Sequence, residues 1–109
     1  SGFDQDRLIE LGARVRDLYV SGVSDSDRVR SVADDEVLGR FAAAVAGELG
    51  GRVGIAPRLF LRKLVDVLDK IEQFPDFDPY TDYEVKIAPS ELSDAERAEL
   101  TAGDVVLDL

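Results

Sequence analysis

Three stretches of the chain repeat apolar residues at the three- and four-residue spacing that places them on one helix face. Residues 4–20, 34–49 and 57–74 therefore predict three long helices. The third has the widest apolar arc, so we expect it to be the central helix of the core. The expected core positions are, in chain order, Leu8, Leu11, Val15 and Leu18, then Val37, Leu38, Phe41, Val45 and Leu49, then Phe60, Leu61, Leu64, Val65, Leu68 and Ile71.

Turn-forming residues mark the ends of these helices. Gly22 ends the first helix, and the glycine pair at 50–51 ends the second by permitting a left-handed residue. Pro75 stops the third, because the residue before a proline is disfavoured in helical geometry. Residues 24–27 form a capping pattern for a single short turn of helix through Val32, which is too brief to be stable unless it is packed.

The segment after the third helix has a different pattern. Residues 82–87 alternate polar and apolar positions, as a half-buried strand does, and residues 104–109 resemble a second strand. Ser93 and Glu96 form a capping box that predicts one short helix. Four aromatic residues are expected to anchor the intervening loop to the helices: Phe74, Phe77, Tyr80 and Tyr83.

The predicted fold is mainly α, in a single domain spanning residues 1–109. Residues 3–74 are expected to form an orthogonal bundle of three long helices. Residues 75–109 are expected to form an acidic C-terminal extension packed on that bundle, containing a short strand or hairpin and one short helix. The chain of 109 residues, 45% of them hydrophobic, is long enough for one compact domain of this kind.

The composition excludes several classes of protein. The chain has no run of about 18 apolar residues that would span a membrane and no basic-then-apolar leader, so we expect a cytoplasmic location. It has no cysteine and no histidine, which excludes disulfides and the common zinc sites. Asp66 and Asp69 share a helix face, but nothing near them completes an acid–base pair, and we predict no catalytic residues. The chain also lacks methionine, which predicts that it is a segment of a longer protein.

Acidic residues gather after the third helix, but their spacing does not fit a calcium loop. An EF-hand loop starting at Asp76 would need an acidic or amide residue at position 80, glycine at 81 and glutamate at 87. The chain has Tyr80, Thr81 and Ile87 at these positions. We therefore predict no metal site, and we expect the carboxylates of this segment to solvate a loop.

The formal net charge is −10, from 23 acidic and 13 basic residues. Such a charge repels a polyphosphate backbone over roughly a Debye length, so direct binding to nucleic acid is disfavoured. A winged-helix DNA-binding fold has a similar order of elements, but it needs a basic recognition helix, which the chain lacks. Four basic residues nevertheless fall within twelve positions, and they can attract one phosphate group despite the global charge: Arg52, Arg58, Arg62 and Lys63.

The helix expected over residues 34–49 opens on Asp34, Asp35 and Glu36, an acidic start that can be capped in the ordinary way. The third helix begins differently. Pro57 fits the first helical position, yet no Ser, Thr, Asp or Asn precedes it to cap the free amides. Arg58 then places a cation in the first turn, which the helix dipole disfavours by about 0.3–1 kcal/mol. Such a start favours an anion, for which phosphate is the usual candidate. Alternatively, Arg58 pairs with one of the many carboxylates or lies along the surface.

No phosphate-cradling GxxxxGK[ST] loop occurs in the chain, so Arg58 can only assist in binding a nucleotide. This limit indicates a helical subdomain that closes over a nucleotide held by a different domain.

Several short segments resemble one protein family. The similarity is to the C-terminal region of bacterial P-loop ATP-binding proteins, in particular the ATP-binding components of bacteriophage exclusion (BREX) and related phage growth limitation systems. It extends over nearly the whole chain. The segments are VRDLY at 15–19, GGR at 50–52, APR at 56–58, LVDVLD at 64–69, FDP at 77–79 and DY at 82–83.

The resemblance implies a role for the start of the third helix. In AAA+ ATPases more broadly, the C-terminal helical lid often carries a sensor 2 arginine near the start of its third helix, after a turn that contains glycine. Residues 54–58 are similar in placement, which implies that Arg58 reaches the terminal phosphate of ATP bound by the preceding P-loop domain, outside this chain. The neighbouring residues implied in cofactor binding are Arg52, Gly54, Pro57 and Arg62. The chain departs from the AAA+ pattern in lacking Walker A and Walker B elements, and the acidic extension after Phe74 is not a general lid feature.

Two functions are compatible with these features of the sequence. The first is a helical lid of a phage-defence ATP-binding protein, not catalytic alone, which supplies a sensor arginine and a surface for the preceding domain, for self-association or for a defence-system partner. The alternative is an acidic protein–protein interaction module with no nucleotide role, in which residues 74–83 engage a basic partner.

Overall fold

A computed structural model gives the fold and describes residues 5–48 and 56–92. This part of the chain is mainly helical, which confirms the predicted class, and it contains no strand. None of its helices is long and apolar enough to cross a membrane. The elements are α1 (Gln5–Ser21), α2 (Ser26–Val32), α3 (Asp35–Glu48), α4 (Ala56–Gln73) and the short 3-10 helix η2 (Pro89–Glu91).

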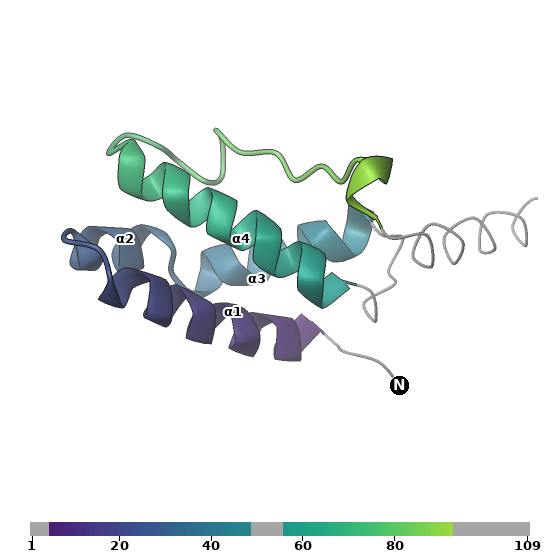
Figure 1. Cartoon of the computed structure of the whole chain (residues 1–109), viewed down its shortest axis with the longest axis horizontal. Helices are drawn as coiled ribbons and strands as arrows, with labels where there is room; N and C mark the ends of the chain where they lie inside the picture. The colour runs from purple at the N-terminus through teal and green to yellow at the C-terminus, as the bar shows by residue number, and fades with distance from the viewer. Residues whose placement is uncertain (1–4, 49–55, 93–109) are drawn as a thin grey trace, which may run out of the picture.

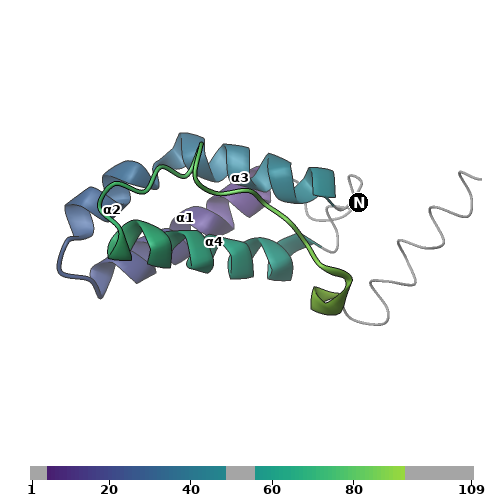
Figure 2. The ribbon, with the colours of Figure 1, turned by 90° about the horizontal axis from the view of Figure 1, so that it is seen from above.

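The three long helices lie lengthwise beside one another (Figures 1 and 2). Helices α1 and α4 run in the same direction along the molecule, α3 runs in the opposite direction, and α2 lies at the end where α1 finishes. The predicted orthogonal arrangement of the bundle is therefore not confirmed. The predicted helix boundaries agree with the structure to within one residue at each end that the structure describes.

The buried face of α1 differs from the predicted one. Leu18 is 74% exposed, and Leu11 and Val15 are only partly buried. Gly12 lets α4 approach closely, because a Cβ atom at this position would lie 2.8 Å from Cζ of Phe60. The positions of α1 that are buried recur every four residues: Leu8, Gly12, Arg16 and Val20.

Helix α2 is short, and packing against its neighbours holds it in place, as the sequence requires. Its central residue Val29 is fully buried. From the same helix, Arg28 donates hydrogen bonds from Nη1 to the carbonyl oxygen of Ile71 at 2.8 Å and from Nη2 to that of Glu72 at 3.1 Å. These carbonyls lie in the last turn of α4, where backbone acceptors have no partner within the helix, so α2 caps the end of α4.

Helix α3 has the acidic, capped start that the sequence predicts. Oδ1 of Asp34 accepts a hydrogen bond from the backbone N–H of Val37 at 2.9 Å, which satisfies one of the free amides of the first turn. Ala42 and Ala46 are also buried, and Leu49 lies outside the described residues. The predicted core positions Val37, Leu38, Phe41 and Val45 are all buried.

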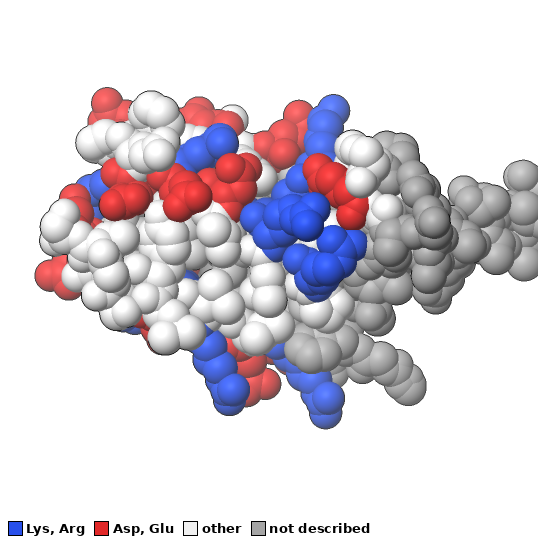
Figure 3. Space-filling view, viewed as in Figure 1, with Lys and Arg blue, Asp and Glu red and all other residues white. Residues whose placement is uncertain are grey.

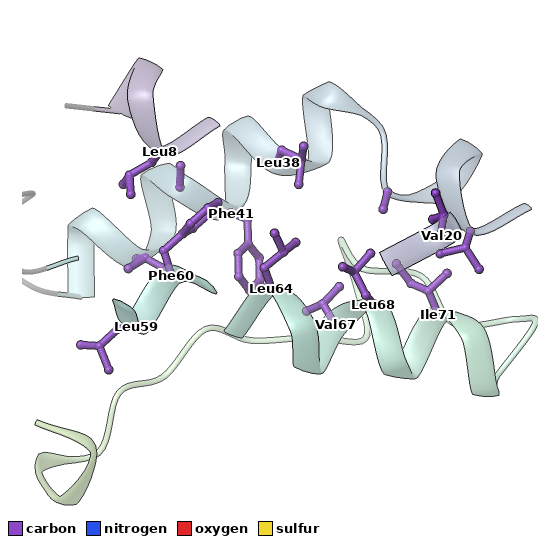
Figure 4. Packing of buried hydrophobic residues seen from close by; sticks show 14 residues of the cluster. Leu8, Val20, Leu38, Phe41, Leu59, Phe60, Leu64, Val67, Leu68 and Ile71 are labelled. Carbon is purple, nitrogen blue, oxygen red and sulfur yellow. The ribbon is translucent and has the colours of Figure 1, made fainter. Parts of the chain in front are cut away.

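A single hydrophobic core joins the helices, and α4 supplies its largest share (Figure 4). The rings of Phe41 and Phe60 meet there, with centroids 6.0 Å apart. Each fully buried side chain of this size stabilises the fold by about 1.5–3 kcal/mol relative to leaving it exposed. Helix α4 is the core helix, as predicted, but its buried face differs in part from the predicted one. Leu61 is only partly buried, and Val65 is 38% exposed. The predicted positions that are buried are Phe60, Leu64, Leu68 and Ile71, and the structure adds Leu59 and Val67.

Residues 74–92, which we call the C-terminal strap, run back over α3 and α4 (Figure 2). Tyr83, Val85 and Ile87 are partly buried against the core and alternate with exposed residues, as predicted. They form no strand, however, because the described chain offers them no strand partner. Side chains hold the segment instead. For example, Oε1 of Glu48 accepts a hydrogen bond from the backbone N–H of Ile87 at 3.3 Å.

The predicted aromatic anchors of the strap divide into two groups. Phe77 and Tyr83 pack against the core, whereas Phe74 is 55% exposed and Tyr80 is 47% exposed. The short helix predicted after Ser93 and the strand predicted for residues 104–109 lie outside the described residues.

Candidate functional site at the start of helix α4

The first turn of α4 differs from that of the other helices in its charge. Helices α1, α2 and α3 each carry at least one acidic residue in the first turn, whereas α4 carries none. Pro57 is partly buried in this turn, and Arg58 is exposed. The structure thus places the guanidinium of Arg58 at a helix start whose own dipole is positive, and this combination raises the local attraction for an anion.

Arg58 and Lys63 hold the end of the C-terminal strap. Nη2 of Arg58 donates to the backbone carbonyl oxygen of Glu91 at 3.1 Å. The ammonium of Lys63 lies 2.8 Å from each oxygen of the Glu91 carboxylate. The side chains of Lys63 and Glu91 are 14% and 25% exposed, so this ion pair is more shielded from water than the Lys86–Glu84 pair, whose side chains are 74% and 79% exposed. The first two turns of α4 therefore carry positive charge, and they bind the backbone carbonyl and the carboxylate of Glu91.

Arg62 lies one turn after Arg58 and is also exposed. Basic side chains gather over this half of α4 on the face shown in Figure 3. Asp66, four residues after Arg62, accepts hydrogen bonds from the hydroxyl of Tyr83 at 3.0 Å and from Lys70 at 3.2 Å. Of the other predicted site residues, Arg52 and Gly54 lie outside the described residues.

This arrangement of cationic side chains can bind an anion. Neither cysteine nor histidine occurs anywhere in the chain. In the part of the chain that the structure describes, no group of three or more acidic side chains is placed to hold a metal ion. The exposed guanidinium groups present forked N–H donors that match the oxygens of a phosphate or carboxylate.

The carboxylates on the flank of α4 serve as hydrogen-bond acceptors for tyrosines. The hydroxyl of Tyr19 donates to Asp69 at 2.5 Å and to Glu72 at 3.3 Å, which ties the end of α1 to α4. Burial raises the pKa of the phenols of Tyr19 and Tyr83 above the ordinary value, and the hydrogen bonds to Asp69 and Asp66 raise them further. These tyrosines stay protonated donors at neutral pH and fix the orientation of α1 and of the strap on α4.

Arg16 is a buried residue that the hydrophobic pattern did not identify. It is 8% exposed, and its Nη1 donates to the carbonyl oxygen of Ala33 at 3.0 Å and to Oδ1 of Asp35 at 2.9 Å, while its Nε donates to Asp17 at 3.1 Å. Burial by itself lowers the pKa of Arg16, but the bonds to Asp35 and Asp17 outweigh burial and the pKa is raised. The sequence feature that indicates its burial is its spacing, four residues after Gly12 and four before Val20.

A pocket lies between α3 and the C-terminal strap. It has a volume of about 370 Å³ and is lined by residues of both segments, including Arg40, Phe41 and Tyr83. At its edge the guanidinium carbon of Arg40 lies 4.8 Å from the centre of the Tyr80 ring, within the range of a cation–π contact. The walls are of mixed polarity, so this feature fits a peptide or another side chain better than a phosphate group.

Together these observations define a small helical domain with a cationic helix start. Comparison with known proteins then places it in a family. The family model for the BREX system ATP-binding protein BrxC/D matches residues 1–87, and the chain belongs to this family. The predicted resemblance to bacteriophage exclusion ATP-binding proteins is thereby confirmed. No curated protein and no solved structure matches the chain.

Proposed function

We propose that this chain is a helical lid of a BREX ATP-binding protein, and that Arg58 contacts the terminal phosphate of ATP held mainly by a separate P-loop domain of the same protein. The family is one of ATP-binding proteins, yet the 109 residues contain no phosphate-cradling loop. The nucleotide is then bound chiefly elsewhere, and this chain contributes to it from outside. It is not catalytic on its own.

The observation that carries the proposal is the exposed guanidinium of Arg58 in a first turn that has no acidic residue. One of its contacts, the hydrogen bond to Glu91, is to a neutral backbone carbonyl. Exchange of that acceptor for a charged phosphate oxygen strengthens the hydrogen bond, because bonds to ionised groups are roughly twice as strong as neutral ones.

The neighbouring residues support Arg58 in this role. Pro57 fixes the backbone at the start of the helix, and Arg62 adds positive charge one turn further on. By the family resemblance, Arg52 and Gly54 are further candidates for cofactor binding, and both lie outside the described residues.

The energy of one such contact is enough to control a lid. A hydrogen bond between an arginine and a charged group contributes about 1.5–3 kcal/mol, which corresponds to roughly a 10- to 150-fold shift between open and closed arrangements. Lid closure would then report which nucleotide the neighbouring domain holds.

Turnover of ATP by the full-length protein tests the proposal. Arg58→Ala should lower ATP hydrolysis or ATP-dependent assembly by at least about tenfold while the fold stays intact. Arg58→Lys should recover only part of the loss, because an ammonium lacks the forked donor geometry. Arg30→Ala is the matched control, since Arg30 is an exposed arginine of α2. Equal turnover in Arg58→Ala and Arg30→Ala would remove the sensor role.

The exposed aromatic residues of the strap favour a second candidate function. Phe74 and Tyr80 are 55% and 47% exposed beside a run of carboxylates, a surface that suits a basic protein partner. A partner captured by the full-length protein, lost in the double variant Asp76→Asn and Asp78→Asn, and indifferent to nucleotide would favour this interaction module over the lid.

A further inference from the structure

An apolar strip lies on the surface along the line where α1 and α4 meet. We call it the α1–α4 face and define it by Leu11, Val15, Leu18, Leu61 and Val65. Figure 3 shows the uncharged area that spreads across this side of the molecule. Leu18 is 74% exposed and Val65 is 38% exposed, and the other three residues are partly buried.

The core does not account for this strip. Val15 and Leu61 contribute to the core from its edge, but Leu18 and Val65 lie outside it. Single exposed apolar residues are ordinary, whereas a contiguous apolar strip rimmed by charged residues is typical of an interaction surface. The rim here includes Arg14 on α1 and Arg62 on α4, both exposed.

The α1–α4 face is also the flank of α4 that the chain's other described elements leave uncovered. The C-terminal strap covers one flank through Lys63 and Asp66, which bind Glu91 and Tyr83. Helix α3 covers the inner side, where Phe41 meets Phe60.

The backbone position of Arg58 lies on the same flank as the apolar strip, while its guanidinium reaches across to the carbonyl oxygen of Glu91 in the strap. Positions 58, 61 and 65 are separated by three and four residues, so Arg58, Leu61 and Val65 follow one line along the surface of α4. A body that presents a phosphate to Arg58 therefore approaches on the side where Leu61 and Val65 are the next residues it meets.

We infer that the α1–α4 face is the surface on which the nucleotide-holding domain of the same protein docks when Arg58 engages the phosphate. This inference rests on the proposed function. The partner surface is expected to be apolar opposite Leu18 and Val65 and to carry its anionic group, the bound phosphate, at the Arg58 end. Burial of the apolar strip would supply the energy of docking, and the single charged contact would make docking depend on the nucleotide.

Site-specific labelling of introduced cysteines tests this inference. The chain has no cysteine of its own, so Leu18→Cys and Val65→Cys each place one thiol on the face within this segment. Phe74→Cys is the matched control, because Phe74 is an exposed apolar residue at the far end of α4. Maleimide labelling is followed by peptide mass spectrometry in the full-length protein, with and without a non-hydrolysable ATP analogue.

The expected result is slower labelling at positions 18 and 65 with the analogue and no change at position 74. A face docked about 80% of the time labels about fivefold more slowly, because only the undocked fraction reacts. Equal rates with and without the analogue at all three positions would overturn the inference. So would protection that depends on protein concentration, which assigns the face to a second copy, or protection lost when residues 93–109 are deleted, which assigns it to that segment.

The failure of this inference can be told apart from the failure of the proposed function. If Arg58→Ala lowers turnover but the two cysteines stay unprotected, the sensor role stands and the docking surface lies elsewhere. If Arg58→Ala leaves turnover unchanged, the proposed function itself has failed, whatever the labelling shows.

Discussion

Replacement of Arg16 by methionine removes the main polar contact between α1 and the start of α3. The guanidinium donates to the carbonyl of Ala33 and to the carboxylates of Asp35 and Asp17, while its stem lies in the buried face of α1. Methionine keeps a flexible apolar stem of similar length and removes every donor. The variant therefore isolates the hydrogen bonds from the packing.

The size of the effect follows from the exposure of each partner. Ala33 is fully buried, so its carbonyl loses a donor that water does not readily replace, at a cost of about 1–3 kcal/mol. The side chain of Asp35 is 81% exposed, and such ion pairs contribute only about 0–1 kcal/mol. Asp17 keeps its bond to Arg30. We expect a loss of about 2 kcal/mol in the free energy of unfolding, which lowers Tm by about 10 °C for a domain of this size.

Urea and thermal unfolding, followed by circular dichroism, measure this loss. Arg14→Met is the matched control, because an exposed arginine of the same helix should change stability by no more than about 0.5 kcal/mol. Arg16→Lys should lie between the two, since it keeps the charge but not the forked donors. If Arg16→Met is as stable as Arg14→Met, the buried hydrogen bonds contribute nothing and the reasoning is wrong.

Two further predictions concern the contacts of α1 with α4. Gly12→Ala should destabilise the fold by about 1 kcal/mol, because overpacking against Phe60 exceeds the gain in helix propensity, whereas Gly47→Ala, with nothing within 4 Å of the new Cβ, should stabilise it in the same unfolding assay. The folded-state pKa of Tyr19 is raised, so its bond to Asp69 contributes fully below the unfolded pKa near 10 and is lost as the pH rises above it. Unfolding free energies measured from pH 8 to 11 should therefore fall less steeply in Tyr19→Phe than in the wild type, and parallel curves would contradict this.

The sequence predicts the helices well, because their signals are local. Apolar spacing, the acidic start at Asp34, and the stop at Pro75 each act within one or two turns, and the structure has helices with these boundaries. In α3 the apolar stripe and the buried face coincide.

Local signals do not predict which face of α1 is buried. Its leucines and valines fit two neighbouring faces, and the structure buries the one that contains Gly12 and Arg16. Gly12 is buried because α4 approaches it. Arg16 is buried because it binds the carbonyl of Ala33, just after α2, and the carboxylate of Asp35 at the start of α3. Both reasons are tertiary, and neither can be seen in the spacing of apolar residues. The exposure of Leu18 follows from the same rotation of the helix.

In the strap, too, the secondary structure depends on the fold as well as on the local pattern. Alternation correctly predicts which of residues 82–87 face the core, but a strand also needs a neighbour to pair with, and pairing is a property of the fold. The candidate site was predicted on Arg58 from the unusual start of α4, and Arg62 was added by the cluster of basic residues and by the family resemblance. The contact of Arg58 and Lys63 with Glu91 was not, because it joins positions about 30 residues apart.

The central claim is that Arg58 recognises the terminal phosphate of ATP. The most direct test compares the equilibrium Kd of the full-length protein for ATP and for ADP, in the wild type and in Arg58→Ala. We predict that the variant binds ATP at least about tenfold more weakly and binds ADP as the wild type does, because only ATP carries the phosphate that the guanidinium contacts. Unchanged binding of ATP, or an equal weakening for both nucleotides, would contradict the claim.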